Sequence, residues 1–141
     1  MKKSTGNLYE TMQSSKNYED FYKAEKGELI FDSLKQYLES MMKEKGVSKT
    51  QLIERSNIEK GYAYQILRGD KKNPSRDKCL MLAFGLGLNL QETQKLLHIA
   101  NVNELYIRSM RDSVIIFCIE KGMTLMQANE KLDEYGAELI E

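Results

Sequence analysis

The stretch that decides the fold runs from residue 46 to residue 75 and reads GVSKTQLIERSNIEKGYAYQILRGDKKNPS. Its apolar residues recur every three or four positions, which is the spacing of one face of an α-helix. This pattern has two parts, 49–56 and 59–68, and Asn57 stands between them where the chain must turn. After glycine, asparagine is the residue that best accepts a left-handed backbone. The sequence therefore predicts two short helices joined by a tight turn.

The second of these helices has one apolar side and one polar side. Its apolar side consists of Ala63, Ile66 and Leu67. The opposite side, with the residue at its N-terminal flank, consists of Gly61, Tyr64, Gln65, Arg68 and Lys60. Such a helix, held across a short turn by a first helix, can enter the major groove of DNA, about 12 Å wide, and offer side chains to base edges. The stretch is thus predicted to be a helix-turn-helix.

Helical patterns continue on both sides of this motif. Asp32 is a predicted N-cap for a helix with an apolar stripe of Leu34, Tyr37, Leu38, Met41 and Met42 that ends at Gly46. Three helix-to-helix corners share one pattern: Gly46-Val47-Ser48, Gly87-Leu88-Asn89 and Gly122-Met123-Thr124. Each capping residue meets Gln or Glu three positions later, which predicts a capping box at the start of the next helix. With one proline in 141 residues, the chain is predicted to be all-α.

The last two corners belong to a longer match at a spacing of 35 residues. Residues 76–97 and 111–132 both begin with Arg-Asp and align through their glycines and leucines, so they are predicted to form two helical hairpins. Taken alone, 114–119 (VIIFCI) also suits a buried strand, and the alignment favours a helix there. Two explanations stay open, an internal duplication and a capping pattern common to any helical hairpins.

Residues 30–100 resemble the Cro/phage-repressor-type (XRE-type) helix-turn-helix regulators, which have the lambda-repressor-like fold. The resemblance depends on a set of matching features: Gly46-Val47-Ser48, Leu52, Asn57-Ile58, Ile66, Gly69, and Lys71-Lys72-Asn73-Pro74-Ser75 before a helix that ends in Gly-Leu-Asn-Leu. Three positions depart from the family pattern: Ile53, Asn57 and Ala63. Ile53 adds volume where Ala63 removes it, and cores tolerate swaps that conserve volume.

The resemblance implies a DNA-binding transcriptional regulator and assigns its contacts. The base-facing residues would be Lys60, Gly61, Tyr62, Tyr64 and Gln65, with the tyrosines also able to touch sugar, phosphate or a thymine methyl group. Gln65 suits adenine, Lys60 suits guanine, and Gly61 would let the backbone approach closely. The phosphate-contacting residues would be Lys49, Arg68, Lys71, Lys72 and Arg76.

Charge supports this interpretation in one half of the chain only. The net charge is zero, but residues 46–78 carry eight Lys/Arg against four Asp/Glu, whereas residues 79–141 carry five against nine. A neutral chain can thus present one basic and one acidic face. Overall neutrality, the helix-weakening Gly61 and the surplus apolar surface at 114–119 favour the alternative, an adaptor or antitoxin-like module that uses the same fold to bind a protein. The carboxylate of Glu59 would also repel phosphate.

Three segments are predicted. Residues 1–28 are polar and partly flexible, with one amphipathic turn at 18–22; residues 29–100 form the helix-turn-helix domain; residues 101–141 form a hairpin packed on it. Because 114–119 is apolar all round, its outer side needs cover from the first hairpin, the N-terminal segment or a second subunit, and we expect a role in homodimerisation.

Other functions find little support in the sequence. Cys79 and Cys118 lie in apolar runs and are interpreted as reduced core residues. His98 has no companion metal ligands, and the Gly85-Leu86-Gly87 segment lacks the third glycine of a dinucleotide loop. We therefore expect no metal, no cofactor and no enzymatic activity. No apolar run suits a membrane span or a signal peptide, so a cytoplasmic protein is expected.

Overall fold

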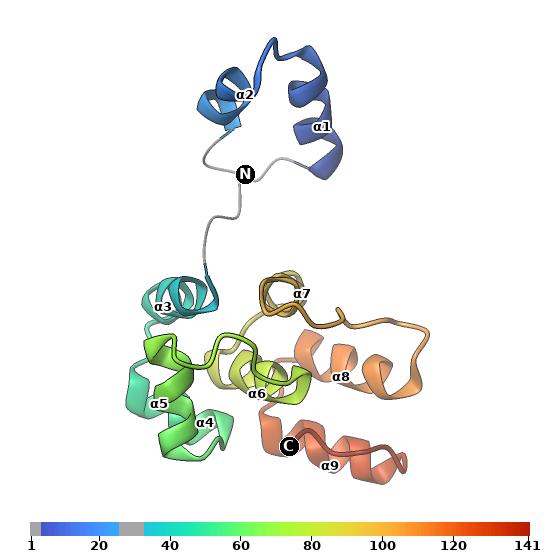
Figure 1. Cartoon of the computed structure of the whole chain (residues 1–141). Coiled ribbons are helices and arrows are strands. Elements are labelled where there is room, and N and C mark those ends of the chain that lie inside the picture. Colours follow the sequence, from blue (N-terminus) through green and yellow to red (C-terminus); the bar gives the residue numbers. More distant parts are fainter. Residues whose placement is uncertain (1–3, 26–32) are drawn as a thin grey trace. The chain divides into compact units, whose positions relative to one another are not determined.

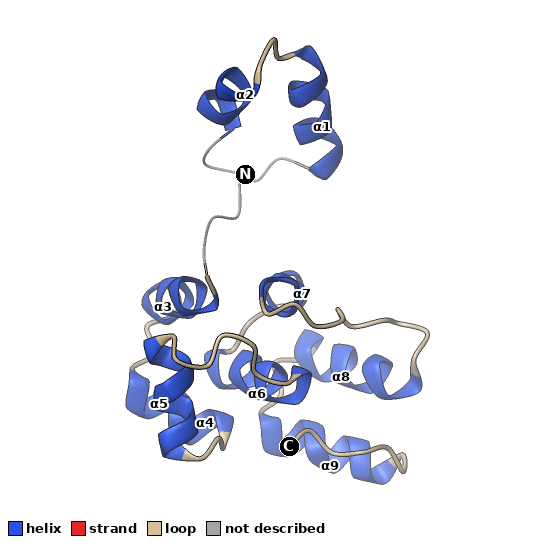
Figure 2. Ribbon diagram, viewed as in Figure 1, coloured by secondary structure: helices blue, strands red, loops and turns tan. Residues whose placement is uncertain are grey.

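The computed structural model describes residues 4–25 and 33–141, and every regular element in those ranges is an α-helix (Figures 1 and 2). The all-α prediction is confirmed. Contacts divide the chain into two units, with the boundary between Phe31 and Asp32. The first unit contains α1 (Thr5–Ser14) and α2 (Tyr18–Glu25). The second contains α3 (Leu34–Lys45), α4 (Lys49–Ser56), α5 (Lys60–Arg68), α6 (Arg76–Leu86), α7 (Leu90–Ile99), α8 (Met110–Glu120) and α9 (Leu125–Glu134).

The first unit holds more helix than its composition predicts. α1 begins at Ser4, whose hydroxyl accepts a hydrogen bond from the Asn7 N–H at 3.1 Å, and it contains no buried residue. In α2, Phe21 is buried and its ring lies 6.0 Å from that of Tyr18. The amphipathic turn at 18–22 is thus part of a helix, but α1 was missed, because a helix with no apolar stripe leaves no periodic pattern in the sequence.

All three predicted capping boxes are present in the second unit. Ser48, Asn89 and Thr124 each accept a hydrogen bond from the amide three residues on, and each receives the return bond from the side chain of that residue. The predicted cap Asp32 lies outside the described residues, and Ser33 caps α3, with Gln36 as its partner. At the three corners Gly46, Gly87 and Gly122 have φ between 66° and 68°, a left-handed conformation in which glycine carries no steric penalty.

α6 occupies the middle of the second unit, with α3, α4 and α5 on one side of it and α8 and α9 on the other (Figure 1). It is apolar nearly all round, and seven of its residues are buried. Because Gly85 has no side chain, α6 can pack closely against α4. A Cβ atom there would lie 3.0 Å from Leu52 Cδ1 and 3.1 Å from the Ser56 backbone nitrogen. Gly85 is thus explained by the close packing of α6 on α4.

Asn57, Ala63 and Ile53 each have a defined place in the second unit. Asn57 has φ of 57° and takes the left-handed position at the end of α4. Ala63 is buried, while Ile53 is half-buried and packs against the core. Both cysteines are free and buried, which confirms their interpretation as core residues. Burial raises the pKa of the Cys79 thiol to about 12, so it stays protonated at neutral pH.

The repeat at 35 residues extends from the sequence to the long-range hydrogen bonds. The Gln94 side chain makes two hydrogen bonds with the backbone of Leu105, at 2.9 and 2.7 Å. Asn129, 35 residues later, makes the same pair with Ile140, at 3.1 and 2.7 Å. A shared capping pattern does not require these contacts. The two hairpins therefore repeat each other in tertiary structure as well as in local sequence.

The two hairpins meet through reciprocal ion pairs. Arg76 of the first hairpin binds Asp112 of the second, and Arg111 of the second binds Asp77 of the first. Each hairpin thus offers its arginine to the aspartate of the other. This reciprocal pattern is the one that two subunits make across a two-fold axis in a dimer. The second hairpin thus finds its cover on the first, within one chain.

α8 is a helix throughout, so the alternative of a strand at 114–119 is excluded. Packing buries four of its six apolar residues there: Ile115, Ile116, Cys118 and Ile119. Phe117 remains 47% exposed. Most of the apolar surface of residues 114–119 is therefore buried inside the second unit.

Candidate nucleic-acid interface

The interface begins with the turn between α4 and α5. Asn57 ends α4 in a left-handed conformation, and the buried Ile58 anchors the turn in the core. α5 then begins at Lys60 and keeps Ala63, Ile66 and Leu67 buried. The predicted apolar side of the second helix is thus the side that packs, and the predicted polar side is accessible.

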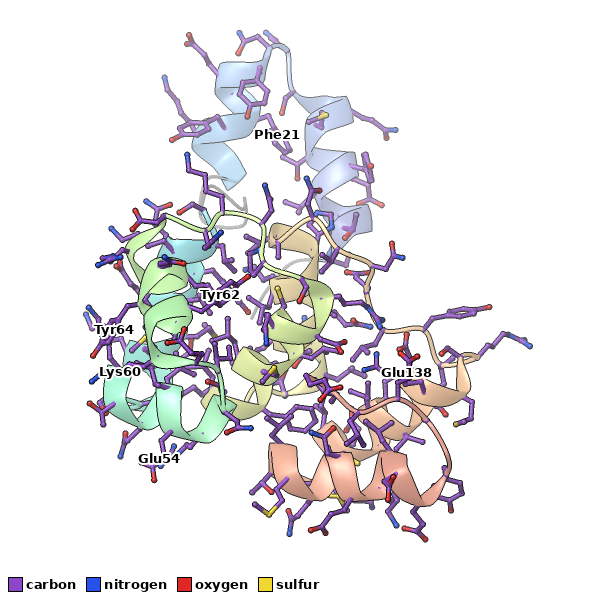
Figure 3. All side chains as sticks on the ribbon, turned by 60° about the horizontal axis from the view of Figure 1, so that its bottom comes forward. Phe21, Glu54, Lys60, Tyr62, Tyr64 and Glu138 are labelled. Carbon is purple, nitrogen blue, oxygen red and sulfur yellow. The ribbon has the colours of Figure 1, made fainter. Side chains whose placement is uncertain are left out.

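The structure leaves the sequence-predicted base-facing residues at the surface to different degrees. Lys60 and Gly61 are exposed, whereas Tyr62, Tyr64 and Gln65 are half-buried. In Figure 3, Lys60 and Tyr64 lie along one edge of α5 and Tyr62 lies on the edge nearer α6. Because aromatic rings have limited rotational freedom, half-buried tyrosines present the same surface at little entropic cost.

Lysine side chains lie beside both tyrosines. The Lys60 ammonium is 6.0 Å from the ring centre of Tyr64. The Lys71 and Lys78 ammonium groups are each 6.0 Å from the ring centre of Tyr62. This is the outer limit of a cation–π contact, so the rings hold these lysines only weakly. The cations remain available to an anionic ligand.

Lys78 is a member of this cluster that the sequence-based assignment missed. It lies in the first turn of α6, two residues after Arg76, and is half-buried. Its charge belongs to the excess of residues 46–78, but nothing in the local pattern shows that α6 brings it next to Tyr62. Only the path of the loop between α5 and α6 does so.

Arg76, by contrast, points away from this surface into the contact between the hairpins. Its guanidinium donates to both carboxylate oxygens of Asp112 and to the backbone oxygens of Asn103 and Glu104. All of its donor nitrogens are thereby engaged, so Arg76 is withdrawn from the phosphate-contacting set. Its place in sequence, directly after the basic loop, gave no sign of this partner.

The other predicted phosphate contacts are accessible. Lys49, Lys71 and Lys72 are exposed. Arg68 is also exposed, but its guanidinium lies 3.1 Å from a carboxylate oxygen of Asp70. A phosphate at Arg68 would have to compete with this pair, so the three lysines and Lys78 form the stronger set.

A carboxylate occupies the N-terminus of α5. The two oxygens of Glu59 accept hydrogen bonds from the amides of Gly61, at 2.9 Å, and Tyr62, at 2.8 Å. These bonds hold the pKa of Glu59 below its ordinary value, against a small opposing effect of burial. A Cβ atom on Gly61 would lie 3.2 and 3.3 Å from the same oxygens. Gly61 thus makes room for the capping carboxylate, a role that the sequence did not reveal.

Two further features were sought in the part of the chain that the structure describes, a metal-binding cluster and a membrane-spanning helix. Residues 4–25 and 33–141 contain no group of three or more His, Cys, Asp or Glu side chains placed to hold a metal ion. Over the same residues, no helix combines the length and apolar character needed to cross a membrane.

Comparison of the chain with protein-family models, with curated proteins and with solved structures gave no significant match. What the interface binds must therefore be inferred from its own residues.

Proposed function

We propose that this protein binds double-stranded DNA at specific sequences and regulates transcription, and that α3–α7 form a lambda-repressor-like domain. The observation that carries the proposal is the surface of α5, a helix packed on one side whose other side holds tyrosines and Gln65 between lysines. A polar helix face flanked by cations has the composition that the major groove requires.

Each side chain has a distinct proposed role. Gln65 makes paired hydrogen bonds to an adenine, and Lys60 reaches the acceptors of a guanine. Tyr64 contacts a thymine methyl group, and Tyr62 contacts sugar or phosphate. The phosphate-binding set is Lys49, Lys71, Lys72 and Lys78, with Arg68 at its edge. Phosphate contacts supply affinity for any duplex, whereas base contacts supply the choice among sequences.

One module of this size reads only a few base pairs, so we propose that two copies act on one DNA site. The large apolar side chains exposed on α8, Met110 and Phe117, are the proposed dimer contact. Sedimentation equilibrium of the wild-type chain and of Phe117→Asp tests it. A concentration-dependent dimer that the substitution weakens supports the contact, and a monomer at all concentrations refutes it.

Selection of bound duplexes from a random pool tests the proposed function itself. The expected result is enrichment of a short motif, or of two copies of it about 10 base pairs or a multiple of that apart. The Lys60→Glu variant serves as a control, because it reverses a charge on the proposed surface at an exposed position and leaves the core intact. No enrichment with the wild-type chain would refute DNA reading.

A second candidate function is an adaptor that binds a protein through the same surface. The observation that favours it is the Glu59 carboxylate fixed at the N-terminus of α5, since an anion there repels phosphate. A pull-down from nuclease-treated lysate of the source cell, with Lys60→Glu as the comparison, tests it. A protein retained by the wild type and lost with the variant supports the adaptor, and retention of no protein refutes it.

A further inference from the structure

An open groove lies on the second unit, away from the polar face of α5. It runs between the end of α4, the two corners at Gly87–Asn89 and Gly122–Thr124, and the outer side of α9. Its volume is about 1420 Å³. Cavities that hold drug-sized molecules have volumes of about 300–1,000 Å³ and enclose most of the ligand. This groove is larger and open, so its dimensions suit a segment of polypeptide better than a small molecule.

The floor of the groove is apolar. The side chains that line it come from both hairpins. Phe84 and Met123 are half-buried, and beneath them Leu88 and Leu125 belong to the core. Met126 also lines the groove, with 73% of its surface exposed. Methionine side chains are flexible and polarizable, and they are common where a surface must fit the side chains of a partner. The floor therefore suits the apolar face of an amphipathic helix.

The borders of the groove are acidic. Four carboxylates line it, those of Glu54, Glu120, Glu130 and Asp133. Within the described residues, none of the four has an ion-pair partner within 4 Å. Of the two cations in the lining, Lys45 lies 2.9 Å from a carboxylate oxygen of Glu92, which leaves Arg55. The groove thus offers an excess of negative charge around an apolar floor.

We propose that this groove binds a short amphipathic helix of a partner protein, with its leucine-like side chains on the floor and lysine or arginine side chains against the four carboxylates. Complementary charge fixes the orientation of such a helix and excludes acidic partners. Nucleic acid is excluded by the same carboxylates. No residue of α5 lines the groove, so a partner bound there leaves the DNA-reading surface free.

The probe for the test is a fluorescent synthetic helix of about 14 residues, long enough for four turns, with Leu on one face and Lys on its flanks. A second peptide carries Glu in place of every Lys. The full-length chain is compared with Glu130→Lys/Asp133→Lys, which reverses two charges of the groove. Glu10→Lys/Glu19→Lys makes the same change of net charge at exposed residues of α1 and α2.

Fluorescence anisotropy should show the Lys peptide bound at least about tenfold more tightly than the Glu peptide. The groove variant should invert that preference, while the control variant should keep it. Amide chemical shifts on binding should change at the two corners and along α9. Equal binding of the two peptides, no binding of either, equal losses in both variants, or shifts confined to other helices would each overturn the proposal. All of these outcomes leave DNA binding by α5 untouched.

Discussion

Arg76 donates hydrogen bonds to both carboxylate oxygens of Asp112, at 3.0 and 2.7 Å, and Arg111 repeats the contact with Asp77, at 3.2 and 3.1 Å. Each arginine also donates to two backbone oxygens in the segment that follows the second helix of its own hairpin. The two arginines therefore tie four segments together: the starts of α6 and α8, and the segments that follow α7 and α9. They hold the second hairpin against the first.

We expect Asp112→Asn to lower the free energy of unfolding by about 2 kcal/mol at pH 7, because it leaves the Arg76 guanidinium without its charged acceptor. Urea denaturation measures the change. Asp133→Asn, at an exposed residue outside these pairs, should change stability by no more than about 0.5 kcal/mol. Similar decreases in the free energy of unfolding of both variants would mean that the Arg76–Asp112 ion pair does not stabilise the fold.

The same pair predicts a pH dependence. Burial alone would raise the pKa of Asp112, but hydrogen bonds from Arg76 and the Tyr106 amide, with the charges of Arg76 and Arg111, hold it below its ordinary value of 3.8. A lowered folded-state pKa adds stability that is present above pH 3.8 and is lost as the pH falls through the folded value. The stability gap between the wild type and Asp112→Asn should thus shrink on acidification from pH 5 to pH 2. A gap that stays constant would contradict this origin.

Gly85→Ala should destabilise the protein, although alanine favours helices. The new Cβ would meet the Ser56 backbone nitrogen at 3.1 Å, and backbone can give way only if α4 moves. We expect a loss of about 1–2 kcal/mol after the gain in helix propensity is subtracted. Thermal unfolding measures it, and an unchanged or higher melting temperature would show that α4 and α6 can separate without cost.

Gly61→Ala makes the same substitution where only a flexible carboxylate is near. The new Cβ would lie 3.2 Å from Glu59 Oε1, and that side chain can move aside. Stability should change by no more than about 0.5 kcal/mol, while affinity for a selected duplex should fall about fivefold, or 1 kcal/mol, if backbone and DNA approach closely here. Unchanged affinity would leave Gly61 with its capping role alone.

Three substitutions on the proposed interface separate its roles. Gln65→Ala should reduce the preference for the selected motif over a scrambled duplex, because it removes a base contact. Lys72→Ala should lower the affinity for both duplexes about equally, and Lys78→Ala should do the same. Competition binding measures the two affinities for each variant. Equal effects of the glutamine and lysine substitutions would remove the division into reading and anchoring residues.

The sequence predicted the local structure well because the signals of the helix boundaries are themselves local. Ser48, Asn89 and Thr124 lie within three residues of the groups they cap, and Asn57 requires only its own backbone conformation. The helical nature of 114–119 came from the repeat, since the apolar run alone was ambiguous. α1 escaped prediction because it buries no side chain.

Side-chain partners far apart in the chain could not be predicted in the same way. Arg76 looked like a phosphate ligand by its position after a basic loop, but its partner is 36 residues away. Lys78 reaches Tyr62 only through the path of the loop between α5 and α6. The groove beside α4 likewise depends on how the two hairpins meet, which no spacing in the sequence encodes.

The central claim is that α5 and the lysines around it bind DNA, and its most direct test is the affinity for a selected duplex measured across salt concentration. With Lys49, Lys71, Lys72 and Lys78 on phosphates, each bound copy should release about four counterions, so log K should fall against log salt with a slope of about −3 to −4 per copy. Lys72→Ala should reduce that slope by about 1 per copy. Binding that is indifferent to salt, or a slope unchanged by Lys72→Ala, would contradict the account.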